Sequence, residues 1–263
     1  MSYPVALLTS LAAGLILATV TAPVGVSGAV FLLPVQLSIL QVPNPAVTPT
    51  NLLFNIVATP GALLRYRRAA SLSSPLTRVL LGGTVPGVII GAIIRVFLIP
   101  GPRLFRLVVA GILLPLGLWL CLGAFMRSRA TPEPLAFSSR WLAVLALGVG
   151  VVGGVYGIGG GSLLSPILVG RGLPTRIVAP AALTATFVTS VAGAVTYTLI
   201  AIASPSQHIA PVWSIGVVAG VGGLIGGYLG AWLQPKVPEG VLRVVLGMLA
   251  LATALLYVWQ ALD

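Results

Sequence analysis

The chain has few charged residues, and acidic residues are the rarest among them. Aspartate and glutamate together number 3 in 263 residues, and charged residues of both signs make up 6%. A soluble domain carries about 25% charged residues, so this composition excludes an ordinary water-exposed surface. Together with a hydrophobic fraction of 58% and a mean hydropathy of +1.12, it predicts an integral membrane protein.

Residues that enzymes use are almost as scarce. One histidine, His208, and one cysteine, Cys121, are present, and the acids are Glu133, Glu239 and Asp263. No combination of these residues has the spacing of a metal site, and no nucleophile has a base partner. We therefore expect no enzymatic activity, no cofactor and no metal ion.

Positive residues are more abundant, with 14 lysines and arginines and a formal net charge of +11. Most stand at the ends of apolar runs, which is typical of membrane anchors and not of a nucleic-acid-binding surface. The runs reach roughly 20 residues, which is too long for the roughly ten-residue strands of a membrane barrel. The expected partners are a lipid bilayer and a small solute, with no nucleic acid, and a homo-oligomer is left open.

The apolar runs divide into ten predicted helical segments, so the expected fold class is all-α. In the first half they cover residues 4–22, 28–40, 47–65, 77–98 and 104–126. In the second half they cover residues 140–156, 161–170, 177–203, 211–233 and 240–261. The second segment of each half is shorter than the ~20 residues that a span requires, so we expect it to begin within the membrane or to tilt.

The two halves align with each other, which indicates an internal duplication. With an offset of 132 residues, Gly25 and Gly28 coincide with Gly157 and Gly160, and further matches follow in the same order along the chain. We therefore predict a first repeat (1–126), a cytoplasmic linker (127–139) and a second repeat (140–263). Because each repeat has an odd number of segments, the second repeat is expected to be inverted relative to the first, with the short segments meeting near the midplane.

The positive residues agree with this topology. Strict alternation puts eleven on one side: Arg65, Arg67, Arg68, Arg78, Arg127, Arg129, Arg140, Arg171, Arg176, Lys236 and Arg243. The remaining three, on the other side, are Arg95, Arg103 and Arg106. Since positive loops face the cytoplasm, both chain termini are predicted to be extracytoplasmic.

A glycine-rich interruption separates the first two segments of each repeat, at residues 22–28 and 157–162. Glycine is a poor helix former, and unwound backbone survives in a bilayer only where protein or a cavity satisfies its polar groups. Each break precedes a helix start, which carries unpaired N–H groups and partial positive charge. Two such starts converging from opposite repeats could bind an anion without any buried arginine. The alternative is that the glycines only permit close helix packing.

The candidate site extends to the third segment of each repeat. Spacings of three and four place four polar residues on one face of the first of these segments: Thr48, Asn51, Asn55 and Thr59. Polar residues inside a span usually face the interior, where they line a pocket or bond between helices. The full substrate-binding prediction is Gly25, Ser27, Gly28, Asn51, Asn55, Gly157, Gly159, Gly160, Gly161, Ser162, Thr186 and Ser190.

These motifs resemble those of the TauE/SafE sulfite exporter family of bacterial transporters. The resemblance is carried by residues 157–166 (GIGGGSLLSP), their weaker counterpart 25–34 (GVSGAVFLLP) and residues 46–51 (AVTPTN). It implies an inner-membrane transporter of sulfite, organosulfonates or related oxyanions, and often export. Without acids at membrane depth, the usual carboxylate proton relay is missing. Transport of another ion, or a non-transporting assembly or sensor subunit, remains the alternative.

Overall fold

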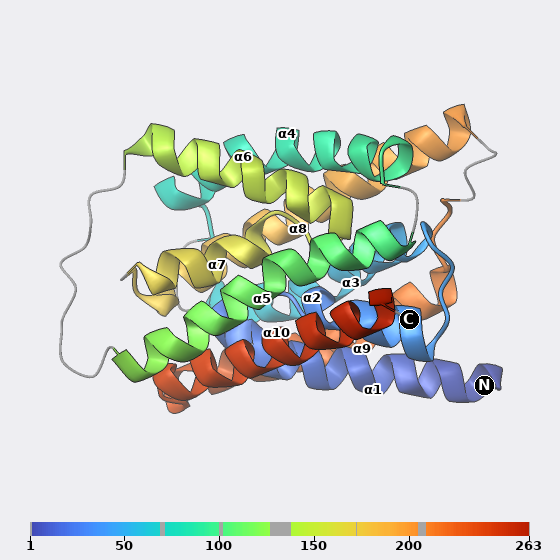
Figure 1. Cartoon of the computed structure of the whole chain (residues 1–263). Helices are drawn as coiled ribbons and strands as arrows, with labels where there is room; N and C mark the ends of the chain where they lie inside the picture. Colours follow the sequence, from blue (N-terminus) through green and yellow to red (C-terminus); the bar gives the residue numbers. More distant parts are fainter. Residues whose placement is uncertain are drawn as a thin grey trace.

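Ten α-helices make up the part of the chain that the computed structural model describes, which is residues 2–68, 72–99, 102–126, 138–171, 173–204 and 209–262. No strand occurs in these ranges, so the all-α prediction is confirmed (Figure 1). Residues 127–137 of the predicted linker lie outside the described residues, as do His208 and Asp263.

The helices follow the predicted order. The first half contains α1 (Tyr3–Thr21), α2 (Ala29–Pro34), α3 (Val47–Tyr66), α4 (Pro75–Phe97) and α5 (Pro102–Met126). The second half contains α6 (Ser139–Tyr156), α7 (Gly161–Gly170), α8 (Thr175–Ala203), α9 (Trp213–Leu233) and α10 (Glu239–Leu262). A 3-10 turn (Ala22–Val24) follows α1, and a π-helical turn (Val35–Ile39) extends α2. With that turn included, every helix begins and ends within two residues of its predicted bounds.

The chain is a multi-pass membrane protein, as its composition predicts. Five described stretches are long and apolar enough to cross a membrane: Tyr3–Val24, Val47–Tyr66, Pro75–Phe97, Thr175–Ala203 and Trp213–Lys236. The other helices contain shorter apolar stretches. Many large hydrophobic side chains are exposed on the outside of the bundle, among them Leu8, Ile16, Val144, Leu199 and Ile202. A bilayer, unlike water, is a favourable surrounding for such a surface.

Helix pairing is the same when the two halves of the chain are exchanged. The most extensive contacts are between α4 and α6 and between α1 and α9. In the same way, α3 packs on α9 and α8 packs on α4, while α3 contacts α8 and α5 contacts α10 (Figure 1). Each pair maps onto another pair, or onto itself, when α1–α5 are exchanged for α6–α10. This is the pattern that a duplicated chain would produce.

Glycines set the close approach within the two largest pairs. A Cβ at Gly83 of α4 would lie 2.6 Å from the carbonyl oxygen of Ala143 in α6. A Cβ at Gly230 of α9 would lie 2.5 Å from the carbonyl oxygen of Thr19 in α1. Both distances are shorter than real Cβ contacts, so these positions accept only glycine without movement of the partner backbone.

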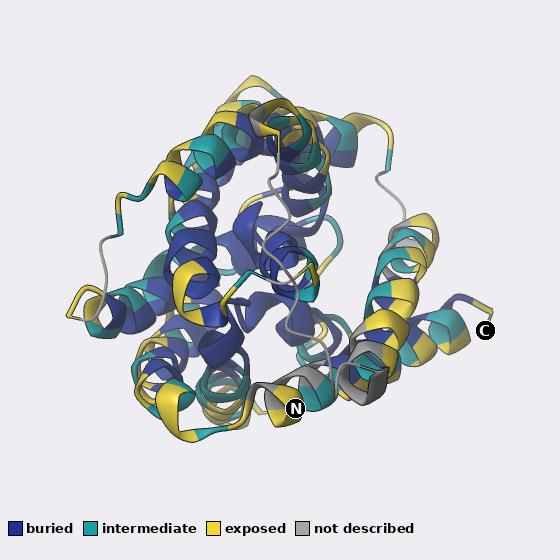
Figure 2. Cartoon of the chain, turned by 90° about the vertical axis from the view of Figure 1, so that its left-hand side faces the viewer, coloured by how far each residue is buried: buried dark blue, intermediate teal, exposed yellow. Residues whose placement is uncertain are grey.

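The two short helices lie at the centre of the bundle. Residues 21–34, which cover the first break and α2, are all buried, and so are residues 153–166 at the second break and in α7. Figure 2 shows this distribution from the left-hand side of Figure 1, with buried residues gathered at the centre and exposed residues at the periphery. Both ends of the chain lie at the same end of the bundle (Figure 1).

Candidate functional site

The first break interrupts the chain between α1 and α2. The α-helix ends at Thr21, a 3-10 turn follows, and Gly25 has a φ of 75°. This left-handed conformation is strained for any residue with a Cβ, which explains a glycine here. A Cβ would also lie 2.5 Å from the Cα of Ala179 in α8. Helix α2 then restarts at Ala29, so the predicted break is present.

The second break separates α6 from α7 in a similar way. Gly157 and Gly159 have φ values of 73° and 72°, and α7 begins at Gly161. The break is closely packed, because a Cβ at Gly157 would overlap the carbonyl oxygen of Thr48 in α3. Gly160 faces α4, where the Cβ of Thr84 would lie 2.5 Å from a Cβ at this position.

The two breaks, one from each half of the chain, contact each other. The backbone N–H of Ser27 donates a hydrogen bond to Oγ of Ser162 at 3.3 Å. The hydroxyl of Ser165 in α7 donates to the carbonyl oxygen of Val24. Two segments about 135 residues apart in the sequence are thus joined through side-chain hydroxyls that are buried.

The two predicted asparagines of α3 form hydrogen bonds with both breaks and with the start of α2. Nδ2 of Asn55 donates to the carbonyl oxygen of Gly157 at 3.3 Å, and Oδ1 of Asn55 accepts a hydrogen bond from the hydroxyl of Ser27. Nδ2 of Asn51 donates to the carbonyl oxygen of Ala29 at 3.0 Å, and its Oδ1 has no hydrogen-bond partner. Both asparagines are fully buried, so their contacts with the breaks are shielded from solvent.

Helix α8 supplies polar groups to the second break, as α3 does to the first. The hydroxyl of Ser162 donates to the carbonyl oxygen of Ile158 at 2.9 Å, and its Oγ lies 3.2 Å from Oγ1 of Thr186. Ser190 is buried, and its Oγ has no hydrogen-bond partner. The sequence prediction missed Thr189, whose Oγ1 accepts a hydrogen bond from the N–H of Gly160 at 2.9 Å. Its position, three residues after Thr186 on the same helix, could have indicated this contact.

Little space remains around the breaks in this conformation. One cavity of about 10 Å³ lies beside the first break, next to Ser27, and another of about 10 Å³ lies beside the second, next to Ile158. Each is about the size of one water molecule. Hydroxyl oxygens also accept hydrogen bonds from backbone N–H groups at the helix starts. Oγ of Ser27, for example, accepts a hydrogen bond from the N–H of Ala29 at 3.2 Å. The breaks are therefore present but closed.

Arg95 is a buried arginine that the sequence analysis does not anticipate. Strict alternation places it at the extracytoplasmic end of a span, where an arginine is expected to act as a membrane anchor. In the structure Arg95 is 0% exposed near the end of α4. Its Nε donates to Oγ1 of Thr48 at 3.3 Å, and its terminal nitrogens donate to Oδ1 of Asn44 and to the carbonyl oxygen of Ile99. The long side chain can reach these oxygens only by turning inward, and they satisfy its donors there.

This arginine lies close to the second break. Oγ1 of Thr48, which accepts from Arg95, also donates to the carbonyl oxygen of Val155 at 3.4 Å. Val155 lies two residues before Gly157. On the same side, the hydroxyl of Tyr197 donates to the carbonyl oxygen of Gly154 at 2.9 Å. Tyr197 also lines a cavity of about 280 Å³ between α3 and α8.

These features define a class of protein. A multi-pass helical bundle whose two halves pair alike, with one broken helix from each half at its centre, is an architecture of secondary transporters. The model of the TauE/SafE sulfite exporter family matches residues 10–257, and the chain belongs to that family. The probable membrane transporter protein YunE of Bacillus subtilis (strain 168) is 24% identical over 256 residues, which cover 89% of this chain and 92% of YunE. No solved structure matches the chain at a significant level.

Proposed function

We propose that the chain carries a small sulfur-containing oxyanion, of the sulfite or organosulfonate type, out of the cell across the bacterial inner membrane. The observation that carries this proposal is the junction of the two breaks, where the N–H of Ser27 meets Oγ of Ser162 at 3.3 Å. Each break presents backbone N–H groups at the centre of the bundle, and such groups bind oxyanions well. Membership of a sulfite exporter family supports the choice of substrate.

The described conformation corresponds to the closed state of an alternating-access cycle. The hydroxyls of Ser27, Ser162 and Thr189 accept hydrogen bonds from N–H groups of the breaks, and an oxyanion would take over this role. Opening the Ser27–Ser162 junction would free N–H groups for a ligand. Exchange of one set of acceptors for another keeps the backbone satisfied throughout.

Arg95 would contribute positive charge to the transport path. Its guanidinium is held in the interior by hydrogen bonds to Asn44, Thr48 and Ile99, on the side of α3 that faces the second break. An arginine at membrane depth is costly and is usually functional. Once the anion is inside the bundle, an inside-negative membrane potential drives it outward, at about 2.3 kcal/mol per charge per 100 mV.

Efflux from proteoliposomes tests the proposal. Vesicles loaded with radiolabelled sulfite should release it faster with the protein than without, and an imposed inside-negative potential should accelerate the release. Ser162→Ala, which removes the hydroxyl at the junction, should change the rate, whereas Thr9→Ala should not, because Thr9 bonds only within its own exposed turn. Absence of sulfite and sulfonate flux, with flux of a cation instead, would reject the anion assignment.

A further inference from the structure

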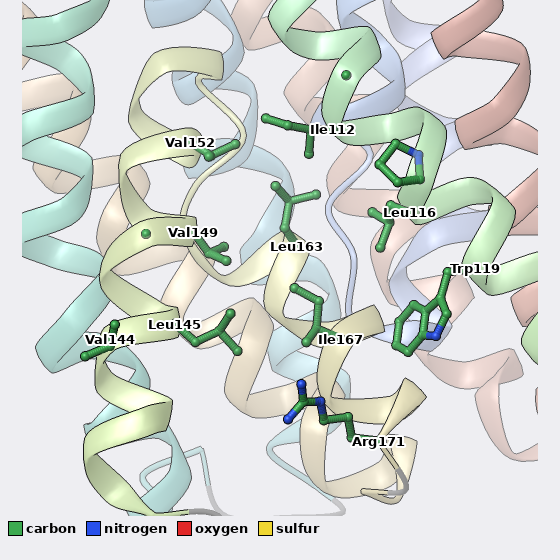
Figure 3. A pocket seen from close by; sticks show the side chains of 13 residues that line it. Ile112, Leu116, Trp119, Val144, Leu145, Val149, Val152, Leu163, Ile167 and Arg171 are labelled. Carbon is green, nitrogen blue, oxygen red and sulfur yellow. The ribbon is translucent and has the colours of Figure 1, made fainter.

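A wide apolar groove runs along α7, the helix that follows the second break. It has a volume of about 800 Å³ and lies between α5 and α6, with α7 as its floor (Figure 3). Of its 13 lining residues, Arg171 carries the one charge, and the others are aliphatic, aromatic, proline or glycine. Leu163 and Ile167 of α7 form the floor. A volume of this size is sufficient for a small-molecule ligand.

The groove opens sideways toward the bilayer. Helix α6 packs on α4 and helix α5 packs on α10, so the two walls of the groove belong to different helix pairs. Val144, on the α6 wall, is 70% exposed, and Trp119, on the α5 wall, is 39% exposed. An apolar groove that opens to the hydrocarbon of a membrane is accessible to acyl chains and unfavourable for a small hydrated anion.

One end of the groove is positively charged and aromatic. Arg171, at the end of α7, is exposed, and its guanidinium carbon lies 4.3 Å from the centre of the Trp141 ring. Figure 3 shows Arg171 and Trp119 at this end of the groove. Arginine binds phosphate through a planar pair of N–H donors, and tryptophan is favoured at the level of lipid headgroups. The charge therefore complements an anionic headgroup.

We infer that this groove binds an anionic phospholipid, with an acyl chain between α5 and α6 and the phosphate group at Arg171. The lipid comes from the leaflet on the side of Arg171, which the distribution of positive residues assigns to the cytoplasm. Its chain touches Leu163 and Ile167 of α7, the helix that begins at the second break. Lipid occupancy is thus tied to the position of α7 and is independent of which anion is transported.

The geometry offers variants that fill the groove. A Cβ at Gly148 of α6 or Gly111 of α5 would have no atom within 4 Å, and both glycines line the groove. Gly148→Phe and Gly111→Leu therefore start a side chain in open space on the two walls of the groove, where the acyl chain would lie. Gly82→Phe on α4 is the matched control, because Gly82 is equally open but lies outside the groove.

Native mass spectrometry of the full chain, equilibrated with phosphatidylglycerol and phosphatidylcholine of identical acyl chains, tests the inference. Wild type and Gly82→Phe should retain phosphatidylglycerol about fivefold better, as expected for one arginine near a membrane surface. Arg171→Gln should lose this preference but still bind lipid. Gly148→Phe and Gly111→Leu should lose binding of both lipids.

Three results would overturn the inference. Equal retention of the two lipids by the wild type would exclude a role for the charge of Arg171. Full retention of lipid by both groove-filling variants would exclude the groove as the lipid-binding site. A dimer that only the filled variants dissociate would identify a second copy of the chain as the occupant. Quenching of tryptophan fluorescence by brominated acyl chains gives an independent measurement in vesicles. Trp119 should account for part of the quenching, so Trp119→Phe and Gly148→Phe should each remove that same part.

Discussion

Replacing Asn55 by leucine tests the junction of the two breaks. Leucine has a similar size but lacks the hydrogen bonds that Asn55 makes with Gly157 and Ser27. In soluble proteins an unsatisfied buried group costs about 1–3 kcal/mol. Hydrogen bonds between membrane helices contribute less, about 0.6 kcal/mol on average and about 1.7 at most. The membrane values apply at the centre of this bundle, so two lost bonds should lower the free energy of unfolding by about 1–3 kcal/mol.

The measurement is a double-mutant cycle of Asn55→Leu and Ser27→Ala, by reversible unfolding in micelles. Because the two side chains share a hydrogen bond, their coupling energy should be about 0.6–1.7 kcal/mol. Sulfite efflux from proteoliposomes should fall in both variants by more than the loss of stability explains, since both side chains form hydrogen bonds at the breaks. Effects on stability that add within about 0.3 kcal/mol, combined with wild-type efflux for Asn55→Leu, would refute the reasoning.

Further predictions concern the buried charge, the helix pairs and the topology. Arg95→Gln should reduce sulfite efflux about tenfold or more, because hydrogen bonds from a charged group contribute about 1.5–3 kcal/mol, and Arg95→Lys should retain more of it; equal rates for both would exclude a role for charge. Gly91→Ala and Gly222→Ala would each overlap a carbonyl oxygen of the partner helix and should lower stability by about 1–3 kcal/mol, measured by thermal unfolding against the open Gly82→Ala. Ser2→Cys, in a chain without the native cysteine, should react with an impermeant thiol reagent from outside whole cells, and labelling only after lysis would reverse the predicted topology.

Most of the fold could be predicted because glycine, proline and apolar runs mark helix ends directly. The breaks at Gly25 and Gly157 were predictable for the same reason, since several glycines in an apolar segment leave few helical options. The sequence marks serines and asparagines near the breaks as candidates, but it does not predict which of them bond to each other. Ser27, Asn55 and Gly157 do meet, as do Ser162 and Thr186.

The burial of Arg95 could not be read from the sequence. An arginine near the end of an apolar run is equally compatible with an interfacial anchor and with an inward-facing side chain. The choice depends on Asn44 and Ile99, which the fold brings to the guanidinium from loops on either side. The close packing around the breaks also could not be read from the sequence, because it depends on which side chains of α3, α4 and α8 the fold brings against them.

The pairing of helices between the two halves of the chain has a consequence for how the protein can fold. Since α1 packs on α9 and α4 on α6, the first helix of each half of the chain packs on the fourth helix of the other half. The most closely packed pairs, α4 with α6, α1 with α9 and α3 with α9, therefore each join a helix of the first half to a helix of the second half. A gene cut between α5 and α6 would yield two fragments that must intertwine before either has its proper neighbours, so neither fragment should fold in the membrane without the other.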